Sequence, residues 1–371
     1  MKLTIDRNRF FGVLGHVQSV VERRNTIPIL SNVKIEAVDG EVRLRATDMD
    51  LEVLESLAAE VAGEGATTVP AHTLYDIVRK LPDGAAIRFD DGGGEKLILD
   101  CARSRFTLAS LPIEDFPVMS AGEMGWQFQL HAKDLRSLID RTRFAISTEE
   151  TRYYLNGIYL HAAKQAGVEV LRAVATDGHR LASVQVPLPA GAAGMPGVIV
   201  PRKCVSELRK LLDEAPGEIT VALSETKIRF GFGAAVLTSK LIDGTFPDYE
   251  RVIPTQNDKQ LDVNCKEFRE AVDRVSAIAS DRSRAVKLAL ADGTLVLWAS
   301  SPEHGTATEE LAVTYQGDAM EIGFNSRYLL DIAQQIEGDS ARFLMADAAS
   351  PTVLQELGDA NAIYVLMPMR V

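Results

Sequence analysis

One helical pattern occurs three times along this chain of 371 residues, and it constrains the fold more than any other feature. Apolar or small residues recur at positions i, i+3, i+4, i+7, i+10 and i+11, which is typical of one buried stripe along a helix of three to four turns. The copies start 125 and 133 residues apart. They are Phe10, Val13, Leu14, Val17, Val20 and Val21; Leu135, Leu138, Ile139, Thr142, Ala145 and Ile146; and Phe268, Ala271, Val272, Val275, Ile278 and Ala279.

Two further markers repeat in step with this pattern. A second apolar helical stripe follows residues 69–70, 200–201 and 323–326. A strand-like run lies between the two helices of each copy, and its alanines Ala46, Ala175 and Ala299 are 129 and 124 residues apart. Three markers in one order, three times over, predict a chain built from repeated domains.

The remaining segments are short alternating strands broken by Gly, Asp and Pro turns. The length also exceeds what one hydrophobic core usually supports. We therefore predict an α+β fold of three similar domains, each with two helices packed on antiparallel sheets. The predicted boundaries are residues 1–124, 125–258 and 259–371.

The composition excludes several classes of protein. The N-terminal segment lacks the apolar run and cleavage site of a signal peptide, and no stretch approaches the roughly 20 apolar residues that span a bilayer. The three cysteines, Cys101, Cys204 and Cys265, are far apart without CxxC spacing. A cytoplasmic protein without disulfides or a structural zinc site is expected.

The formal net charge of −12 at first disfavours nucleic acid as a partner, because DNA affinity comes mainly from Lys and Arg. The three predicted domains carry −6, +1 and −7, and the repeated helices still bear basic residues beside their apolar stripes. These residues either cover solvated helix faces or form one locally basic surface. The sequence alone is compatible with both.

The search for catalytic motifs yields one weak candidate. The chain contains no GxxxxGK[ST], HExxH or GxSxG, so neither a metal nor another cofactor is predicted. Within 176–180 (TDGHR), Asp177 could orient the imidazole of His179 for acid–base work. The alternative is a tight turn after a strand, with a binding role but no catalysis.

The chain ends in an apolar segment, residues 364–371 (YVLMPMRV). Its two methionines suit an adaptable surface for apolar peptide side chains. A last sheet strand that only packs explains the segment equally well.

Several longer words of sequence resemble one family, the bacterial DNA polymerase III β subunits or β sliding clamps, in the same order and over the whole chain. They are RYYLNG (152–157), VATDGHRLA (174–182), IVPRK (199–203), TSKLIDGTFPDY (238–249), MEIGFN (320–325) and YVLMPMR (364–370).

The resemblance implies three similar domains and a head-to-tail homodimer ring with twelve helices lining its channel. Such a ring is non-enzymatic, binds double-stranded DNA without reading sequence, and holds the replicative polymerase catalytic subunit on it. Implied partners are a clamp-loader ATPase complex and other polymerases and repair proteins with short clamp-binding peptides. No cofactor, metal or membrane is implied.

The family's functional residues map onto matching positions of this sequence. The implied DNA contacts are Arg24, Tyr153, Tyr154, Lys203, Asn325 and Tyr328. The implied peptide-binding groove comprises Leu155, Thr176, Gly178, His179, Arg180, Leu181, Pro247, Arg251, Val252, Val365, Met367, Pro368, Met369 and Arg370. The implied dimer interface comprises Arg103, Arg105, Phe106, Leu108, Ile278, Ala279, Glu303, Glu309 and Glu310.

Two departures from the family pattern are visible. Ala279 is smaller than the bulky aliphatic residue expected there, and 280–284 (SDRSR) lacks an aromatic residue, so no DNA contact is assigned to that stretch. Two other functions stay open at this point: an enzyme that uses Asp177 and His179, and a repeat-domain scaffold unrelated to DNA.

Overall fold

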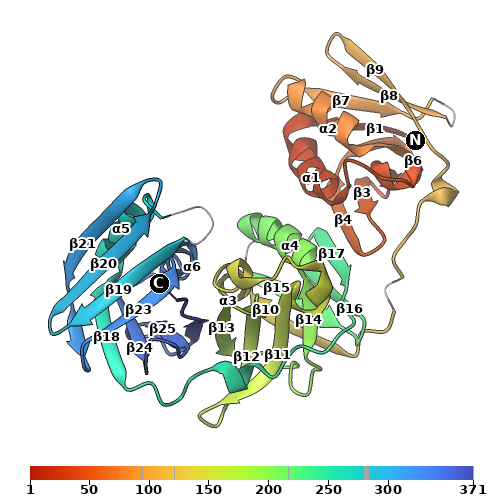
Figure 1. Ribbon diagram of the computed structural model, residues 1–371. Coiled ribbons are helices and arrows are strands. Elements are labelled where there is room, and N and C mark those ends of the chain that lie inside the picture. Colours follow the sequence, from red (N-terminus) through yellow and green to blue (C-terminus); the bar gives the residue numbers. More distant parts are fainter. Residues whose placement is uncertain (93–94, 121, 216, 280–283, 371) are drawn as a thin grey trace. The chain divides into compact units, whose positions relative to one another are not determined.

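The computed structural model describes residues 1–371 except 93–94, 121, 216, 280–283 and 371 (Figure 1). The chain divides into two compact units. The first comprises Met1–Arg136, Pro189–Met195 and Lys203–Leu241, and the second comprises Ser137–Leu188, Pro196–Arg202 and Ile242–Val371.

The first unit contains a five-stranded and an eight-stranded sheet. The five-stranded sheet has the order β5 (Glu60–Gly63), β1 (Lys2–Asp6), β7 (Ala86–Asp90), β8 (Lys96–Cys101) and β9 (Ser104–Ala109). The eight-stranded sheet has the order β10 (Trp126–His131), β15 (Glu218–Leu223), β16 (Lys227–Phe232), β17 (Ala235–Lys240), β4 (Leu51–Ala58), β3 (Glu41–Thr47), β2 (Asn32–Val38) and β6 (Gly65–Pro70). Its helices are α1 (Arg7–Val20), α2 (Ala71–Lys80) and most of α4 (Arg202–Glu214).

Helix α1 shows how the repeated stripe becomes buried structure. The Asp6 carboxylate accepts hydrogen bonds of 3.0 Å from the backbone N–H groups of Asn8 and Arg9, which caps the helix start. The predicted stripe residues Phe10 and Leu14 are 0% exposed. The helix packs on α2, β3 and β4, so its apolar face closes the core of this part of the unit.

The second unit contains a nine-stranded and a four-stranded sheet. The nine-stranded sheet has the order β14 (Val198–Pro201), β11 (Gly157–Gln165), β12 (Val168–Thr176), β13 (Arg180–Pro187), β26 (Ala362–Leu366), β25 (Thr352–Glu356), β24 (Ser340–Met345), β18 (Lys259–Asn264) and β22 (Thr314–Gln316). The four-stranded sheet has the order β21 (Gly305–Ala312), β20 (Thr294–Ser301), β19 (Ala285–Ala291) and β23 (Met320–Asn325). Its helices are α5 (Cys265–Ser276), α6 (Ser326–Ala333) and the last turn of α3 (Ala132–Asp140).

The second copy of the stripe is not one continuous helix, so that part of the prediction was wrong. Helix α3 ends at Asp140, and a 3₁₀ turn, η3 (Arg143–Ala145), follows. The Thr142 hydroxyl donates a 2.5 Å hydrogen bond to the carbonyl of Leu138, a side-chain interaction that competes with regular helix geometry. Leu135, Leu138 and Ala145 are nevertheless buried, so the stripe still predicts core residues correctly.

The three-domain α+β organisation is confirmed by the element order. Each third of the chain runs strand, helix, a group of strands, helix and a closing set of three strands, and the strand pairings of the described residues are antiparallel. Neighbouring thirds share sheets, because β17 pairs with β4 in the first unit and β13 pairs with β26 in the second. The exact boundaries remain predictions.

Candidate functional site

The TDGHR segment forms the turn between β12 and β13 and is held by its own side chains. The Thr176 hydroxyl donates to the Arg180 carbonyl at 2.7 Å and accepts from the Gly178 N–H at 3.1 Å. Asp177 accepts from the backbone N–H groups of His179 and Arg180 at 2.9 and 3.0 Å. The alternative interpretation of the sequence predicted a tight turn here, and the turn is of the Asx type.

Gly178 is required where it stands. Its φ of +87° lies in the left-handed region that other residues adopt at a cost, and a Cβ there would lie 2.9 Å from Nη1 of Arg152. A side chain at this position would therefore strain the turn and push on its neighbour.

Arg180 ties this turn to α6 and to the segment after α3. Its guanidinium donates to Asp177 at 3.1 Å, to Asp331 of α6 at 2.5 Å and to the Phe144 carbonyl at 2.6 Å. It also lies 4.3 Å from the centre of the Tyr328 ring, within cation–π range. With 9% of its surface exposed, Arg180 is a buried structural anchor that orients the turn.

The C-terminal strand β26 lies beside β13 in the sheet. Leu181 pairs with Val365, and the Met367 N–H donates to the His179 carbonyl at 2.9 Å. Tyr364 is fully buried, and this burial raises the pKa of its phenol to about 12. Strand β26 is therefore fixed in the sheet.

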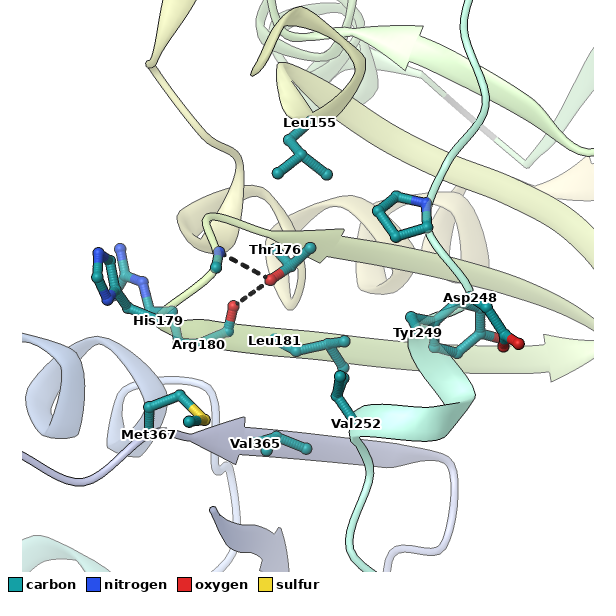
Figure 2. A pocket seen from close by; sticks show the side chains of 12 residues that line it. Leu155, Thr176, His179, Arg180, Leu181, Asp248, Tyr249, Val252, Val365 and Met367 are labelled. Carbon is teal, nitrogen blue, oxygen red and sulfur yellow. Dashed lines mark hydrogen bonds between the residues drawn. The ribbon is translucent and has the colours of Figure 1, made fainter. Parts of the chain in front are cut away.

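A pocket of about 280 Å³ opens between β13, β26 and the 3₁₀ turn η5 (Tyr249–Val252) (Figure 2). Its floor is apolar and buried, with Leu155, Leu181 and Val365 at most 4% exposed. At its rim, Val252 is 51% and Met367 42% exposed. The lining residues are Leu155, Thr176, Gly178, His179, Arg180, Leu181, Pro247, Asp248, Tyr249, Val252, Val365 and Met367.

Most of the predicted groove residues meet in this pocket, but four do not line it. Arg251 lines a neighbouring hollow of about 570 Å³ that shares Val252 and Met367 with the pocket. Pro368, Met369 and Arg370 are not among the lining residues of either hollow. The chain leaves the pocket after Met367 because the Met369 N–H donates to the Gly323 carbonyl at 2.8 Å.

Two lining residues, Asp248 and Tyr249, were missed by the sequence prediction. They directly follow Pro247 in the segment TSKLIDGTFPDY (238–249), which carries part of the resemblance. This adjacency is the sequence signal that could have identified them. Tyr249 is 5% exposed and belongs to the same apolar cluster as Leu155 and Val365.

Asp177 and His179 are not arranged as an acid–base pair. The Asp177 carboxylate holds backbone N–H groups and Arg180, while the His179 ring stacks on Tyr328 with centroids 6.3 Å apart. Among the described residues, no hydrogen bond joins the carboxylate to the imidazole. The geometry favours a binding turn over the enzyme alternative.

Among the implied DNA contacts, Lys203 is already engaged. Its ammonium contacts Glu22, Asp48 at 2.6 Å and the carbonyl of Val20 at 3.1 Å. Burial works against the charged form, but the hydrogen bonds that the ammonium donates to Asp48 and Glu22 prevail and raise the pKa of Lys203. A phosphate would have to compete with these carboxylates.

The other implied DNA contacts are placed as follows. Arg24 is exposed in the segment after α1. Tyr153 is 53% exposed, and its ring meets that of Tyr154 edge-on at 5.8 Å. Asn325 caps α6 by accepting from the Arg327 and Tyr328 N–H groups, while the Tyr328 ring lies under Arg180. Asn325 and Tyr328 thus also have structural roles.

The implied dimer residues lie on or near two sheet edges and just after α5. Arg103, Arg105, Phe106 and Leu108 lie on or just before β9, an edge of the five-stranded sheet, and Leu108 is only 8% exposed. Glu309 and Glu310 lie on β21, an edge of the four-stranded sheet, with Glu303 in the preceding turn. Ile278 and Ala279 are half-buried after α5.

Two of these charged residues already have partners. Arg105 forms a two-pronged pair with Asp100 at 2.7 and 2.9 Å, and Arg274 pairs with Glu309 at 2.5 Å. Residues 280–283 of the SDRSR stretch lie outside the described residues.

Within the described parts of the chain, no group of three His, Cys, Asp or Glu side chains is placed to hold a metal ion. The helices of those parts are also too short or too polar to cross a membrane.

Known proteins resemble the chain over its full length. Three family models of the DNA polymerase III beta subunit match the chain. The model of the N-terminal domain matches residues 1–120, that of the central domain residues 129–248 and that of the C-terminal domain residues 250–370. The beta sliding clamps of Caulobacter vibrioides and Escherichia coli K12 are 52% and 38% identical, with 100% of each chain covered. A crystal structure of a DnaN sliding clamp from Bartonella birtlesii bound to griselimycin is 54% identical, covers 100% of both chains and superposes with a TM-score of 0.98. The chain belongs to the DNA polymerase III beta subunit family, the beta sliding clamps.

Proposed function

We propose that this protein is a DNA sliding clamp: a non-catalytic ring that holds the replicative polymerase on duplex DNA in the cytoplasm. The observation that carries the proposal is the apolar pocket between β13, β26 and η5, formed in a chain that belongs to the clamp family throughout. Such a pocket suits the apolar side chains of a short peptide, since its buried floor and exposed rim gain contact when filled.

The pocket is the proposed docking site for the polymerase, the clamp loader and repair proteins. Related clamps from Bartonella birtlesii and Pseudomonas aeruginosa have been crystallised with griselimycin. We expect griselimycin to bind this protein too, in the pocket described above, and to exclude peptide partners from it. Arg251 and the hollow it lines extend the same surface and would contact a peptide's flanking residues.

The ring itself would form by head-to-tail pairing of two protomers. Strands β9 and β21 each leave one edge without a partner strand among the described residues, and an unpaired edge is a template for another chain. Arg103 and Arg105 near one edge and Glu303, Glu309 and Glu310 near the other supply opposite charges. Pairing β9 of one protomer with β21 of the other would satisfy both edges.

DNA would be held through its backbone. Arg24, Lys203 and the exposed Tyr153 are suited to phosphate and sugar contacts, which position a protein without reading bases. A clamp that must slide requires this kind of contact.

Native mass spectrometry together with griselimycin titration tests the proposal. A dimer of two 40.4 kDa chains that binds griselimycin agrees with it. A monomer at micromolar concentration contradicts the ring, and a dimer without griselimycin binding contradicts the groove. A scaffold unrelated to DNA would give neither retention on DNA nor competition between griselimycin and a polymerase peptide.

A further inference from the structure

A buried polar chain lies directly behind the wall of the pocket that η5 forms. This single 3₁₀ turn contributes both Tyr249, which is 5% exposed, and Val252, which is 51% exposed, to the pocket lining. The opposite wall belongs to β13 and β26, which are fixed by their strand pairing. Among the described residues, no backbone hydrogen bond ties η5 to that sheet, so side chains hold it there.

The Tyr249 hydroxyl has three polar neighbours, and Glu250 is the most distant of them, 3.5 Å away. Nη1 of Arg172 donates to it at 3.0 Å, so the hydroxyl oxygen is an acceptor there and its own hydrogen remains available. Nε2 of His161 lies 3.0 Å away. The other ring nitrogen, Nδ1, is 3.0 Å from the Ala162 carbonyl, which can only accept. Nδ1 therefore carries the hydrogen, and Nε2 accepts from Tyr249.

The resulting order is Arg172 to Tyr249 to His161 to the Ala162 carbonyl, with every group in a role that it can fill. His161 must be neutral to accept, and burial lowers the pKa of its imidazole in that direction. The ring is also fixed in plane, because Tyr159 stacks on it at 4.6 Å between centroids.

Arg172 is itself locked in place. It is 7% exposed and donates to Gln185 at 3.0 and 3.2 Å and to Gln165 at 2.9 Å, both on neighbouring positions of the same sheet. It also donates to Glu250, the second residue of η5, at 3.1 Å. The sheet thus grips η5 at two successive residues through one guanidinium.

We propose that Tyr249 is a positioning residue of the groove: its hydroxyl, held by Arg172 and His161, fixes η5 so that Val252 and Pro247 form the pocket wall before a peptide arrives. The inference rests on the proposed peptide-binding function and adds what prepares the site. A wall fixed in advance spares the ligand the entropy cost of ordering it, and that saving appears as affinity.

The test replaces Tyr249 by Phe in the full-length protein, with Tyr159→Phe as its matched control. Both changes remove one hydroxyl from the same aromatic cluster. None of the described residues hydrogen-bonds the Tyr159 hydroxyl, whereas that of Tyr249 is the middle of the chain. Calorimetric titration with griselimycin should give about tenfold weaker binding for Tyr249→Phe and a change within about twofold for Tyr159→Phe.

A second readout separates positioning from general destabilisation. The methyl groups of Val252 should become more mobile by NMR relaxation in unliganded Tyr249→Phe, while the melting temperatures of the two variants stay close to each other. Unchanged affinity and unchanged Val252 mobility in Tyr249→Phe would overturn the inference, as would equal losses in both variants. If griselimycin does not bind even the wild-type protein, the proposed groove fails instead.

Discussion

The pocket and the proposed DNA contacts differ in whether their side chains already have interaction partners within the folded chain. The pocket offers a buried apolar floor and the half-exposed side chains of Val252 and Met367, which gain contacts only when a ligand arrives. Lys203, in contrast, already contacts Glu22 and Asp48. Filling the pocket adds contacts, whereas binding DNA at Lys203 exchanges one anion for another. Peptide binding should therefore be strong and insensitive to salt, and DNA contact weak and exchangeable, as sliding requires.

The largest expected effect comes from breaking the anchor of the pocket. Arg180→Ala removes a buried guanidinium that holds Asp331 and the Phe144 carbonyl. We expect a loss of about 3 kcal/mol in local stability, because the half-buried carboxylates of Asp177 and Asp331 and the Phe144 carbonyl lose their common partner. Hydrogen exchange of the β13 and β26 amides measures it. Arg105→Ala, which breaks an exposed pair, should cost much less, and equal costs would contradict the contrast.

The next effect concerns the rim of the pocket. Val252→Asp places a carboxylate where a ligand must exclude water, so griselimycin should bind about a hundredfold more weakly. Val168→Asp is the matched control, since Val168 is 63% exposed and does not line the pocket. Surface plasmon resonance at two salt concentrations would show both the loss and its insensitivity to salt. A similar loss in the control would mean that the change acts through charge alone.

A smaller effect tests the exchange of anions at Lys203. Glu22→Gln removes one competing carboxylate, and retention on DNA at low salt should improve about two- to threefold. Glu64→Gln, an equally neutralising change elsewhere on the first unit, serves as control. The gain should vanish at high salt. No difference between the two variants would show that Lys203 does not meet phosphate.

The smallest effect is a pH dependence of the stability that His16 contributes to the first unit through Glu55 and Glu214. Hydrogen bonding to Glu55, 3.0 Å from Nδ1, raises the pKa of His16 despite its burial, and Glu214 lies 3.5 Å from Nε2. Because folding raises the pKa of His16, the protonated imidazole stabilises the folded state. This stabilisation is complete below the pKa of the unfolded chain, about 6.5, and is lost as the pH rises through the pKa of the folded state. Wild-type protein should thus melt higher than His16→Gln at pH 6, and the difference should shrink at pH 8.5. A constant difference would contradict the assignment.

The sequence predicted most of the fold because its periodicity directly reports burial. The stripe of Phe10 and Leu14 marks a helix face that the structure buries completely. The apolar spacing of the second copy could not predict that α3 ends at Asp140, because the hydrogen bond from the Thr142 hydroxyl to the Leu138 carbonyl leaves that spacing unchanged. For the same reason, spacing reports the core better than it reports helix ends.

The TDGHR turn and the C-terminal segment were candidates from their residues alone, but only the resemblance joined them into one site. Val365 and Leu181 are far apart in the chain, and the register of β13 on β26 that joins them is not visible in either segment alone. The predicted groove continues to Arg370, whereas the residues that line the pocket end at Met367, because sequence continuity cannot show that the chain turns toward Gly323 after Met367. The support of Tyr249 by Arg172 likewise depends on a contact between residues 77 positions apart.

Retention on DNA tests the central claim most directly. Purified protein is loaded onto a nicked circular duplex by a clamp-loading ATPase, and the bound fraction is followed by gel filtration before and after a restriction enzyme linearises the DNA. A ring that encircles DNA without gripping it stays on the circle and is lost from the cut ends. Equal loss from circular and linear DNA, or equal retention on both, would contradict the account.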